Sequence, residues 1–261
     1  MEPLASLDGA VVPVADARIP VTDEGLLRGD GVFEVIRLYD GRPFALADHL
    51  ARMTRSAANL RLPFDAASLE SDARALLDAA RPGDGLLRLV VTRGGHRLAL
   101  LEPPPDYPPT LSLGFVEYVP TRVLDGIKSL SYGANVLATR LARERGFDEA
   151  LLVTPHGRVL EGPTSSLLAG LGGRLVTPPL DEHVLDSITR RRLLEVADVA
   201  EEPLTTDDLR RASGAALVST TREVQPVHRI EDIELDLNDP LIQGAAAQVR
   251  ERIASEIAAL T

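Results

Sequence analysis

The hydrophobic positions of the first sixty residues change from an alternating to a helical period. Two short strands are expected in Leu4 to Val14, around the turn Asp8-Gly9. A second hairpin is expected in Val32 to Phe44, around Asp40-Gly41. The following segment predicts a helix, because its apolar residues recur at helical spacing, namely Leu46, Leu50, Met53, Ala57 and Leu60.

The next segment completes a predicted N-terminal α+β domain, residues 1–120. A second helix is expected at about Ala67 to Ala80, and the apolar runs Leu86 to Thr92 and Leu111 to Val119 are expected to return to the same sheet as strands. A turn region, Pro120 to Gly126, favours a domain boundary there. The same domain contains a proline-rich loop with Pro103, Pro104, Pro105, Pro108 and Pro109.

Hairpins dominate the predicted second domain, residues 121–261. Few β-α-β alternations occur, which favours a mixed or barrel-like α/β sheet over a doubly wound one. The closing helix carries an apolar stripe of Ile242, Ala246, Val249, Ile253 and Ile257. The expected elements are a strand containing Lys128, a helix at Asn135 to Gly146, hairpins turning at His156-Gly157 and Gly172-Gly173, a helix at Ser187 to Ala200, a strand at Ala215 to Thr220 and a helix at Pro240 to Leu260.

Composition narrows the possible functions. A formal net charge of −11 argues against nucleic-acid binding. No apolar run of about 18 residues and no basic, apolar leader are found, so we expect a soluble cytoplasmic protein without membrane contact. The chain has no cysteine, and its five histidines follow no metal-binding or catalytic-triad spacing. We therefore expect no metal.

Lysine is almost absent from the chain. Of 28 basic Lys and Arg residues, only Lys128 is a lysine. Guanidinium stays protonated, whereas an amine can lose its proton and form an imine with a carbonyl, the linkage that anchors pyridoxal phosphate. Apolar neighbours such as Ile127 and Leu130 are expected to desolvate this amine and lower its pKa. From the count alone, a single surviving surface lysine is an equally good explanation.

Other segments offer groups that suit such a cofactor. Glu161 ends an apolar strand before Gly162-Pro163, and a carboxylate of this kind can keep a pyridine nitrogen protonated. A phosphate needs helix N-terminal amides, hydroxyls and an arginine. These groups are available at Ser187, Ile188, Thr189, Ser219, Thr220, Thr221 and Arg52. Taken singly, each is better explained as a solvated charge, a helix cap or a turn hydroxyl.

The motifs occur in an order that resembles the class IV (fold type IV) pyridoxal-phosphate enzymes. This family contains branched-chain aminotransferases, D-amino acid aminotransferases and aminodeoxychorismate lyases. The resemblance spans nearly the whole chain. Its pieces are GDGVFEVIRLYDG at 29–41, DHLARMTRSAANL at 48–60, IKSLSYGANVLA at 127–138, DEALLVTPHGRVLEGPTSSL at 148–167, LVTPPLDEHVLDSITR at 175–190 and VSTTREVQPV at 218–227.

The resemblance implies a role for each cofactor residue. Lys128 is similar to the Schiff-base lysine that also acts as acid and base, Glu161 to the partner of the pyridine nitrogen, and Arg52 to the phosphate arginine. The remaining cofactor contacts are implied for Ser187, Ile188, Thr189, Ser219, Thr220 and Tyr132. Two α/β domains with the cofactor between them, and a homodimer, are also implied.

The substrate side departs from the usual family pattern. Arg28 stands where many members carry an aromatic residue, Ser187 replaces a glycine and Ser166 replaces an asparagine. Because an arginine can bind a carboxylate through two hydrogen bonds, Arg28 is a candidate for the substrate carboxylate. The other candidates for substrate contact are Phe33, Arg88, Arg93 and Thr221.

The resemblance predicts a transaminase that moves an amino group between a branched-chain or D-amino acid, or a related primary amine, and a 2-oxo acid. Glu34 favours this reaction, because the lyases more often carry a hydroxyl residue at that position. The alternatives are an aminodeoxychorismate lyase that releases pyruvate and 4-aminobenzoate, and a binding protein that retains the phosphate site without turnover. The handedness of the donor stays open.

Overall fold

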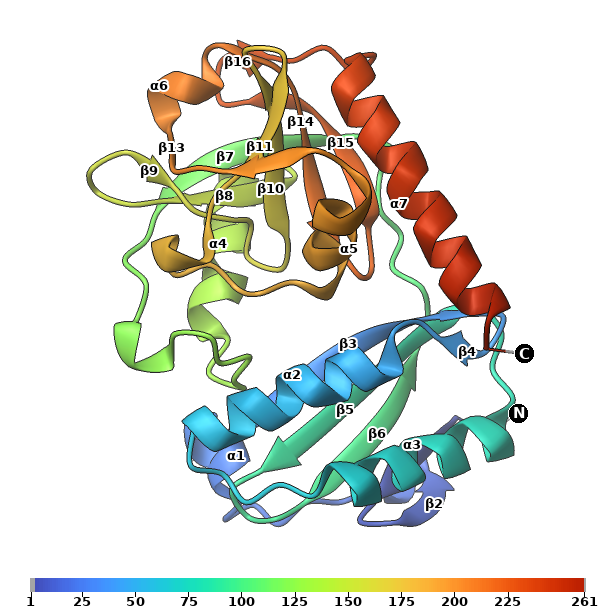
Figure 1. Ribbon diagram of the computed structural model, residues 1–261. Coiled ribbons are helices and arrows are strands. Elements are labelled where there is room, and N and C mark those ends of the chain that lie inside the picture. The colour runs from blue at the N-terminus through green and yellow to red at the C-terminus, as the bar shows by residue number, and fades with distance from the viewer. Residues whose placement is uncertain (1–2, 261) are drawn as a thin grey trace. The chain divides into compact units, whose positions relative to one another are not determined.

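A computed structural model describes residues 3–260 of the chain. These residues form two compact units, each with its own sheet (Figure 1). Unit 1 contains residues 3–106, 126–132 and 256–260, and unit 2 contains residues 107–125 and 133–255. This division differs from the expected boundary between residues 120 and 121: residues 107–120 belong to unit 2, whereas residues 126–132, with Lys128, and residues 256–260 belong to unit 1.

Unit 1 is built on a six-stranded antiparallel sheet in the order β2-β1-β6-β5-β3-β4. Helix α2 packs on β3, and α3 packs on β1 and β6. The elements are β1 (Leu4–Leu7), β2 (Ala10–Pro13), the short helices η1 (Val14–Asp16) and α1 (Glu24–Arg28), β3 (Gly31–Tyr39), β4 (Arg42–Pro43), α2 (Leu46–Asn59), α3 (Ala66–Ala80), β5 (Gly85–Thr92) and β6 (Arg97–Glu102).

Turn chemistry explains both predicted hairpins of unit 1. Asp8 and Gly9 have φ values of 53° and 92°, and Asp40 and Gly41 have φ values of 49° and 75°. Two consecutive left-handed residues give the two-residue turn that matches the twist of the flanking strands, and Asp-Gly adopts it readily. The apolar faces of the sheet and helices then meet in a buried core that includes Ile36, Met53 and Leu89.

Unit 2 contains a ten-stranded mixed sheet in the order β12-β11-β10-β14-β15-β7-β8-β9-β13, with β16 paired to β15. The pairs β7–β8, β7–β15 and β11–β12 are parallel. The elements are β7 (Leu111–Glu117), η2 (Arg122–Leu124), α4 (Gly133–Glu144), β8 (Glu149–Val153), β9 (Arg158–Val159), β10 (Ser166–Leu171), β11 (Arg174–Thr177), η3 (Leu180–Glu182), α5 (Ile188–Val196), β12 (Val199–Glu201), β13 (Leu204–Thr205), α6 (Thr206–Leu209), β14 (Ala212–Ser219), β15 (Glu223–Ile230), β16 (Ile233–Glu234) and α7 (Pro240–Ala258).

Most predicted elements of unit 2 are confirmed. The hairpins turn at Gly157 and at Gly172-Gly173, and each of the three expected helices is present. The helix expected at Ser187 to Ala200 is shorter than predicted, because α5 ends at Val196 and β12 begins at Val199. The predicted apolar stripe of α7 is buried, with Val249 completely inaccessible. Among the residues described, no helix has the length and apolar character that crossing a membrane requires.

Two expectations about strands were wrong, and one strand was missed. Strand β7 does not return to the sheet of unit 1, because it pairs with β8 and β15. Lys128 lies outside any strand: a single bridge joins Val32 to Ser129, and Gly126, at a φ of 68°, turns the chain just before it. Strand β6 was not predicted, although the turn at Gly94-Gly95 that precedes it was visible in the sequence.

Candidate active site

Lys128 lies beside β3 and against aromatic rings in unit 1. Its carbonyl accepts a hydrogen bond of 3.1 Å from the amide of Phe33, and its own amide donates one of 3.1 Å to Ser56 Oγ. The side-chain nitrogen Nζ lies 4.3 Å from the ring centre of Phe33 and 5.4 Å from that of Tyr132. The two rings meet edge to face at 5.2 Å. A half-buried amine is thus held between two backbone anchors and two rings.

A buried charge cluster occupies the same unit. Arg52, on α2, donates two hydrogen bonds of 2.7 Å to the carboxylate of Glu34, on β3. His49, one turn before Arg52, lies 2.8 Å from the same carboxylate through Nδ1. Glu34 and His49 are fully inaccessible and Arg52 is 6% exposed. The spacing of His49 and Arg52 on one face of α2 brings both side chains onto one carboxylate.

The cluster fixes its own protonation states. Burial alone would raise the pKa of Glu34, but the charges of Arg52 and His49, and their hydrogen bonds, hold this pKa well below its ordinary value. Burial lowers the pKa of His49, and the positive charges of Arg52 and Lys128 lower it further against the opposing effect of Glu34. Glu34 is therefore ionised and accepts from His49 when Nδ1 carries a proton, and the charge of Lys128 acts on the same cluster.

Glu161 follows the β8–β9 hairpin in unit 2. Its backbone carbonyl accepts from the amide of Leu152 at 2.9 Å, and its Oε1 accepts from the amide of Leu185 at 3.0 Å. The side chain is half-buried. Burial and the negative charge of Glu161 together raise the pKa of Tyr118. Glu161 is thus an oriented carboxylate at a strand end.

The predicted hydroxyl groups come together at the N-terminus of α5. Ser187 caps the helix and accepts from the amide of Arg190 at 3.4 Å, while Thr189 Oγ1 lies 3.4 Å from Thr220 Oγ1 at the end of β14. Arg190 is only 2% exposed and anchors the helix, because its side chain donates a hydrogen bond of 2.9 Å to the carbonyl of Pro178. The positive end of a helix dipole and several hydroxyls at one place suit an anion.

The predicted substrate arginines are engaged to different degrees. Arg88 donates to Glu102 through two hydrogen bonds, and Arg93 binds Asp30 at 2.9 and 3.2 Å. Arg93 also donates to two backbone carbonyls, and its pKa is raised by the hydrogen bond with Asp30. Arg28 makes one ion pair with Glu24 at 2.8 Å on α1, and its side chain is 74% exposed. The three arginines therefore differ in how readily they can turn to a ligand.

Thr221 and Phe33, the other predicted substrate residues, lie in different units. Phe33 is 7% exposed and contacts Lys128 as described. Thr221 lies in the turn after β14, and its hydroxyl is 2.9 Å from that of Tyr107.

Sequence reasoning assigned no site role to Glu34 or His49. Glu34 was used only to separate two reaction types, and His49 matched no motif. The available signal was the spacing of a histidine and an arginine, three residues apart on a helix, after a strand whose apolar run contains a carboxylate. A charge in such a run needs a partner.

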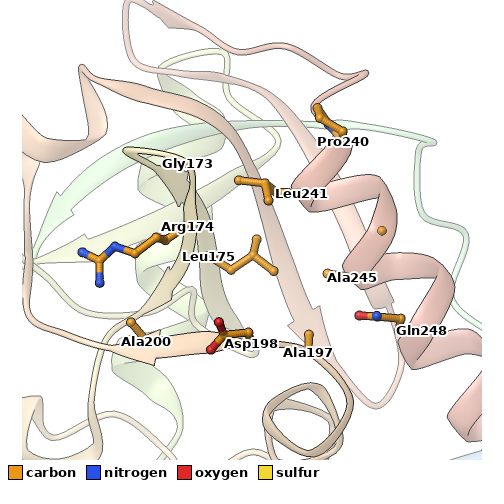
Figure 2. A pocket seen from close by; sticks show the side chains of 11 residues that line it. Gly173, Arg174, Leu175, Ala197, Asp198, Ala200, Pro240, Leu241, Ala245 and Gln248 are labelled. Atoms are coloured by element: carbon orange, nitrogen blue, oxygen red, sulfur yellow. The ribbon is translucent and has the colours of Figure 1, made fainter.

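A cavity of ≈ 480 Å³ in unit 2 lies apart from these groups. It is lined by β11 residues such as Arg174 and Leu175, and by α7 residues such as Leu241 and Gln248 (Figure 2). None of the predicted site residues lines it.

Known proteins of one family resemble this chain over most of its length. Residues 31–230 match the family described as amino-transferase class IV. A putative branched-chain-amino-acid aminotransferase of Methanocaldococcus jannaschii is 35% identical over 86% of this chain and 87% of its own length. A D-alanine aminotransferase of Bacillus licheniformis is 30% identical over 96% of this chain and 97% of its own length.

A solved structure extends the similarity to the fold. The hypothetical aminotransferase from Mycobacterium tuberculosis in its PLP-bound form is 27% identical, with a TM-score of 0.86, and the match covers 97% of this chain and 99% of that one. The same protein has been solved in a form with alpha-ketoglutarate and PMP bound. The expected two-sheet α/β fold is therefore confirmed, and the chain belongs to the class IV aminotransferases, enzymes that use pyridoxal phosphate.

Proposed function

We propose that this aminotransferase moves an amino group between a branched-chain or D-amino acid, or a related primary amine, and a 2-oxo acid. Its relatives carry the names of branched-chain and D-alanine aminotransferases. The observation that carries the residue assignment is the position of Lys128 Nζ, 4.3 Å from the Phe33 ring centre and within electrostatic reach of the Glu34 cluster. This is the only lysine of the chain.

Each of the assigned residues has one task. Pyridoxal phosphate, when bound, supplies a carbonyl that reacts with amines and a ring that accepts electrons. Lys128 Nζ would hold that carbonyl until a donor amine displaces it, and the freed amine would then take up and return the proton of the donor α carbon. Glu161 keeps the pyridine nitrogen protonated. Tyr132 borders the lysine amine, because Lys128 Nζ lies 5.4 Å from the centre of the Tyr132 ring.

The phosphate is assigned to Arg52 and to the helix N-terminus described above. Arg52 is held rigidly by two hydrogen bonds to Glu34, so its orientation does not have to be fixed again on binding. In unit 2 the phosphate contacts are Ser187, Ile188, Thr189, Ser219 and Thr220.

Unpaired hydroxyl groups near Glu161 support a polar ligand. Ser165 and Ser166 are 4% and 3% exposed, and their Oγ atoms have no hydrogen-bond partner among the described residues. Leaving a buried hydroxyl unpaired is unfavourable, which favours a ligand or water next to these groups. Ser166 stands where family members usually carry an asparagine.

Arg28 is the strongest candidate for the donor carboxylate. Its single exposed ion pair with Glu24 contributes little, so the side chain can leave it at small cost. Arg88 and Arg93 would each give up a two-bond carboxylate contact. Phe33 and Thr221 are assigned to the rest of the substrate.

We also propose a cytoplasmic homodimer. Exposed apolar side chains on α4 favour a partner surface, because Val136, Leu137 and Leu141 are 42%, 52% and 40% exposed on one helix. The cytoplasm holds the free amino acids and 2-oxo acids that the proposed reaction needs.

A donor screen tests this function. Purified enzyme with its coloured cofactor is mixed with each enantiomer of alanine, leucine and valine, and with simple primary amines, without an acceptor. A matching donor is expected to bleach the visible absorbance, and pyruvate or 2-oxoglutarate is expected to restore it. No bleaching with any donor would refute the proposal. Pyruvate release from aminodeoxychorismate without an acceptor would instead establish the lyase reaction.

A further inference from the structure

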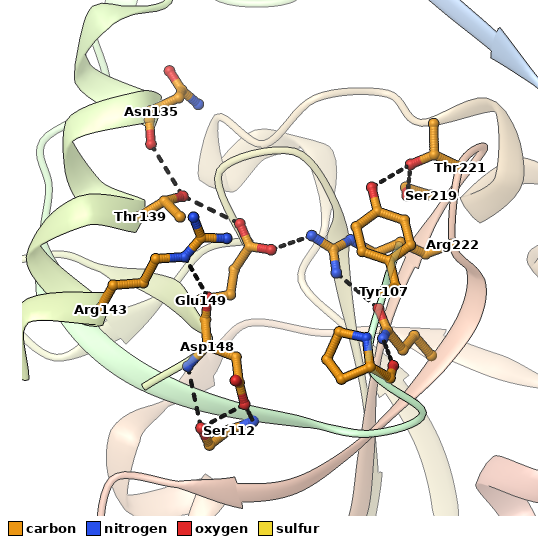
Figure 3. Close-up of polar contacts among 12 residues, drawn as sticks. Tyr107, Ser112, Asn135, Thr139, Arg143, Asp148, Glu149, Ser219, Thr221 and Arg222 are labelled. Atoms are coloured by element: carbon orange, nitrogen blue, oxygen red, sulfur yellow. Dashed lines mark hydrogen bonds and ion pairs between the residues drawn. The ribbon is translucent and has the colours of Figure 1, made fainter. Parts of the chain in front are cut away.

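The turn that carries Ser219, Thr220 and Thr221, here called the hydroxyl turn, is connected to a buried network in unit 2 (Figure 3). The turn joins β14 to β15. Its backbone closes with a hydrogen bond of 3.2 Å from the amide of Arg222 to the carbonyl of Ser219. The backbone of Arg222 is therefore part of the hydrogen-bonded turn.

Arg222 is held from three sides. Its guanidinium forms an ion pair with Glu149, and each side chain is 5% exposed. It also donates a hydrogen bond of 2.7 Å to Gln225, and its Cζ lies 4.0 Å from the ring centre of Tyr107. Glu149 in turn accepts a hydrogen bond of 3.2 Å from the hydroxyl of Thr139 on α4. A planar guanidinium with a buried carboxylate, an amide and an aromatic face has no freedom to rotate.

Tyr107 connects this pair to the hydroxyl turn. Its ring covers Arg222, and its hydroxyl lies 2.9 Å from Thr221 Oγ1. Thr221 Oγ1 lies 3.3 Å from Ser219 Oγ. Pro108, the residue after Tyr107, is fixed as well, because its carbonyl accepts a hydrogen bond of 2.5 Å from the side-chain amide of Gln225. Tyr107 thus orients two hydroxyls of the turn from a neighbouring segment.

We propose that Tyr107, Arg222 and Glu149 are positioning residues that hold the hydroxyl turn in the shape required to bind the cofactor phosphate. This inference rests on the proposed function, which assigns Ser219 and Thr220 to the phosphate. The three residues need no contact with the cofactor. They fix the direction in which the turn presents its hydroxyls, and preorganisation of this kind strengthens binding by reducing the ordering that binding requires.

The test separates phosphate binding from general stability. Dissociation constants of the full-length protein for pyridoxal phosphate and for pyridoxal, which lacks the phosphate, are measured for wild type and Tyr107→Phe. The variant keeps the ring over Arg222 and loses only the hydroxyl. We expect pyridoxal phosphate to bind about two- to tenfold more weakly, the effect of one neutral hydrogen bond, and pyridoxal to bind as in wild type. The matched control is Tyr39→Phe in unit 1, which is expected to change neither constant.

Two further outcomes sharpen the result. Combining Tyr107→Phe with Thr221→Val is expected to weaken pyridoxal phosphate less than the product of the two single effects, because both remove one hydrogen bond. An equal loss of both ligands, no loss of either, or fully multiplicative effects would overturn the inference. If wild type itself binds pyridoxal phosphate no more tightly than pyridoxal, the failure lies in the proposed phosphate role of the turn, and the inference falls with it.

Discussion

Glu34→Gln tests the buried cluster most informatively. The substitution keeps the shape of the side chain and removes the negative charge that contacts both Arg52 and His49. Arg52, 6% exposed, then loses the ionised acceptor of its Nε and Nη2 hydrogen bonds. Removing one partner of a buried ion pair typically costs about 3–5 kcal/mol, and we expect a loss of that size in the free energy of unfolding at pH 7.

The pH dependence of this loss follows from the lowered pKa of Glu34. A carboxyl group whose pKa is lower in the folded state adds stability above its unfolded pKa, here 4.5, and this stability is lost as the pH falls towards the folded value. The gap between wild type and Glu34→Gln should therefore shrink below pH 4.5, by up to about 1.4 kcal/mol per pH unit. Above pH 5 Glu34 is ionised in both the folded and the unfolded wild type, so its titration should add no further pH dependence to the difference in unfolding free energy.

His49 contributes a second pH dependence of stability, which differs between the two proteins. Its pKa is lowered from 6.5 in the folded state, so the unfolded chain binds more protons below pH 6.5 and stability falls on acidification through that range. Glu34 opposes this lowering, so Glu34→Gln lowers the pKa of His49 further, and the His49 contribution widens the gap between the two proteins on acidification.

Urea unfolding followed by circular dichroism, at half-unit steps from pH 3.5 to 7.5, gives the required free energies. The matched control is Glu70→Gln on α3, which breaks an exposed ion pair with Arg74 and should cost less than about 1 kcal/mol at every pH. A Glu34→Gln loss at pH 7 no larger than that of the control would refute the account of this cluster.

Three further substitutions follow from the assigned roles. Arg28→Ala is expected to raise KM for amino acid donors about tenfold or more while leaving amines without a carboxylate unchanged, and an equal effect on both donor types would contradict the role in carboxylate binding. Glu161→Gln is expected to lower kcat by about two to four orders of magnitude with the cofactor still bound. Unchanged turnover would contradict the assignment of Glu161 to the pyridine nitrogen. Arg222→Met leaves Glu149 buried without its cationic partner, so thermal unfolding should show a loss of about 3–5 kcal/mol; a loss as small as that of Arg174→Met, which breaks an exposed pair, would be inconsistent with the buried network.

Local chemistry made much of the fold predictable from the sequence. The Asp-Gly turns, the apolar stripes of α2 and α7 and the hairpin at Gly157 depend on residues close together in the chain. The sheet to which β7 belongs was not predictable in this way, because the pairing of Leu111–Glu117 with β8 and β15 depends on long-range register. Likewise, nothing local showed that the chain around Lys128 runs beside β3 without forming a strand of its own.

The site residues were likewise predictable only in part. Lys128 was identified as the single lysine of the chain, and Ser187 and Thr220 were identified as hydroxyl residues suited to a phosphate. The Glu34 cluster did not, because a carboxylate in an apolar strand shows its partners only when α2 packs on β3. Tyr107 was also missed, since its contact with Thr221 joins residues 114 positions apart.

The central claim is that Lys128 binds the cofactor carbonyl, and the composition of the chain allows a direct measurement. Borohydride reduction converts an imine into a stable secondary amine, and peptide mass mapping then locates the attached group. Because the chain has one lysine, the account predicts a single modified peptide containing Lys128, and no such modification in Lys128→Arg. Bound cofactor with an unmodified Lys128 after reduction would contradict the claim.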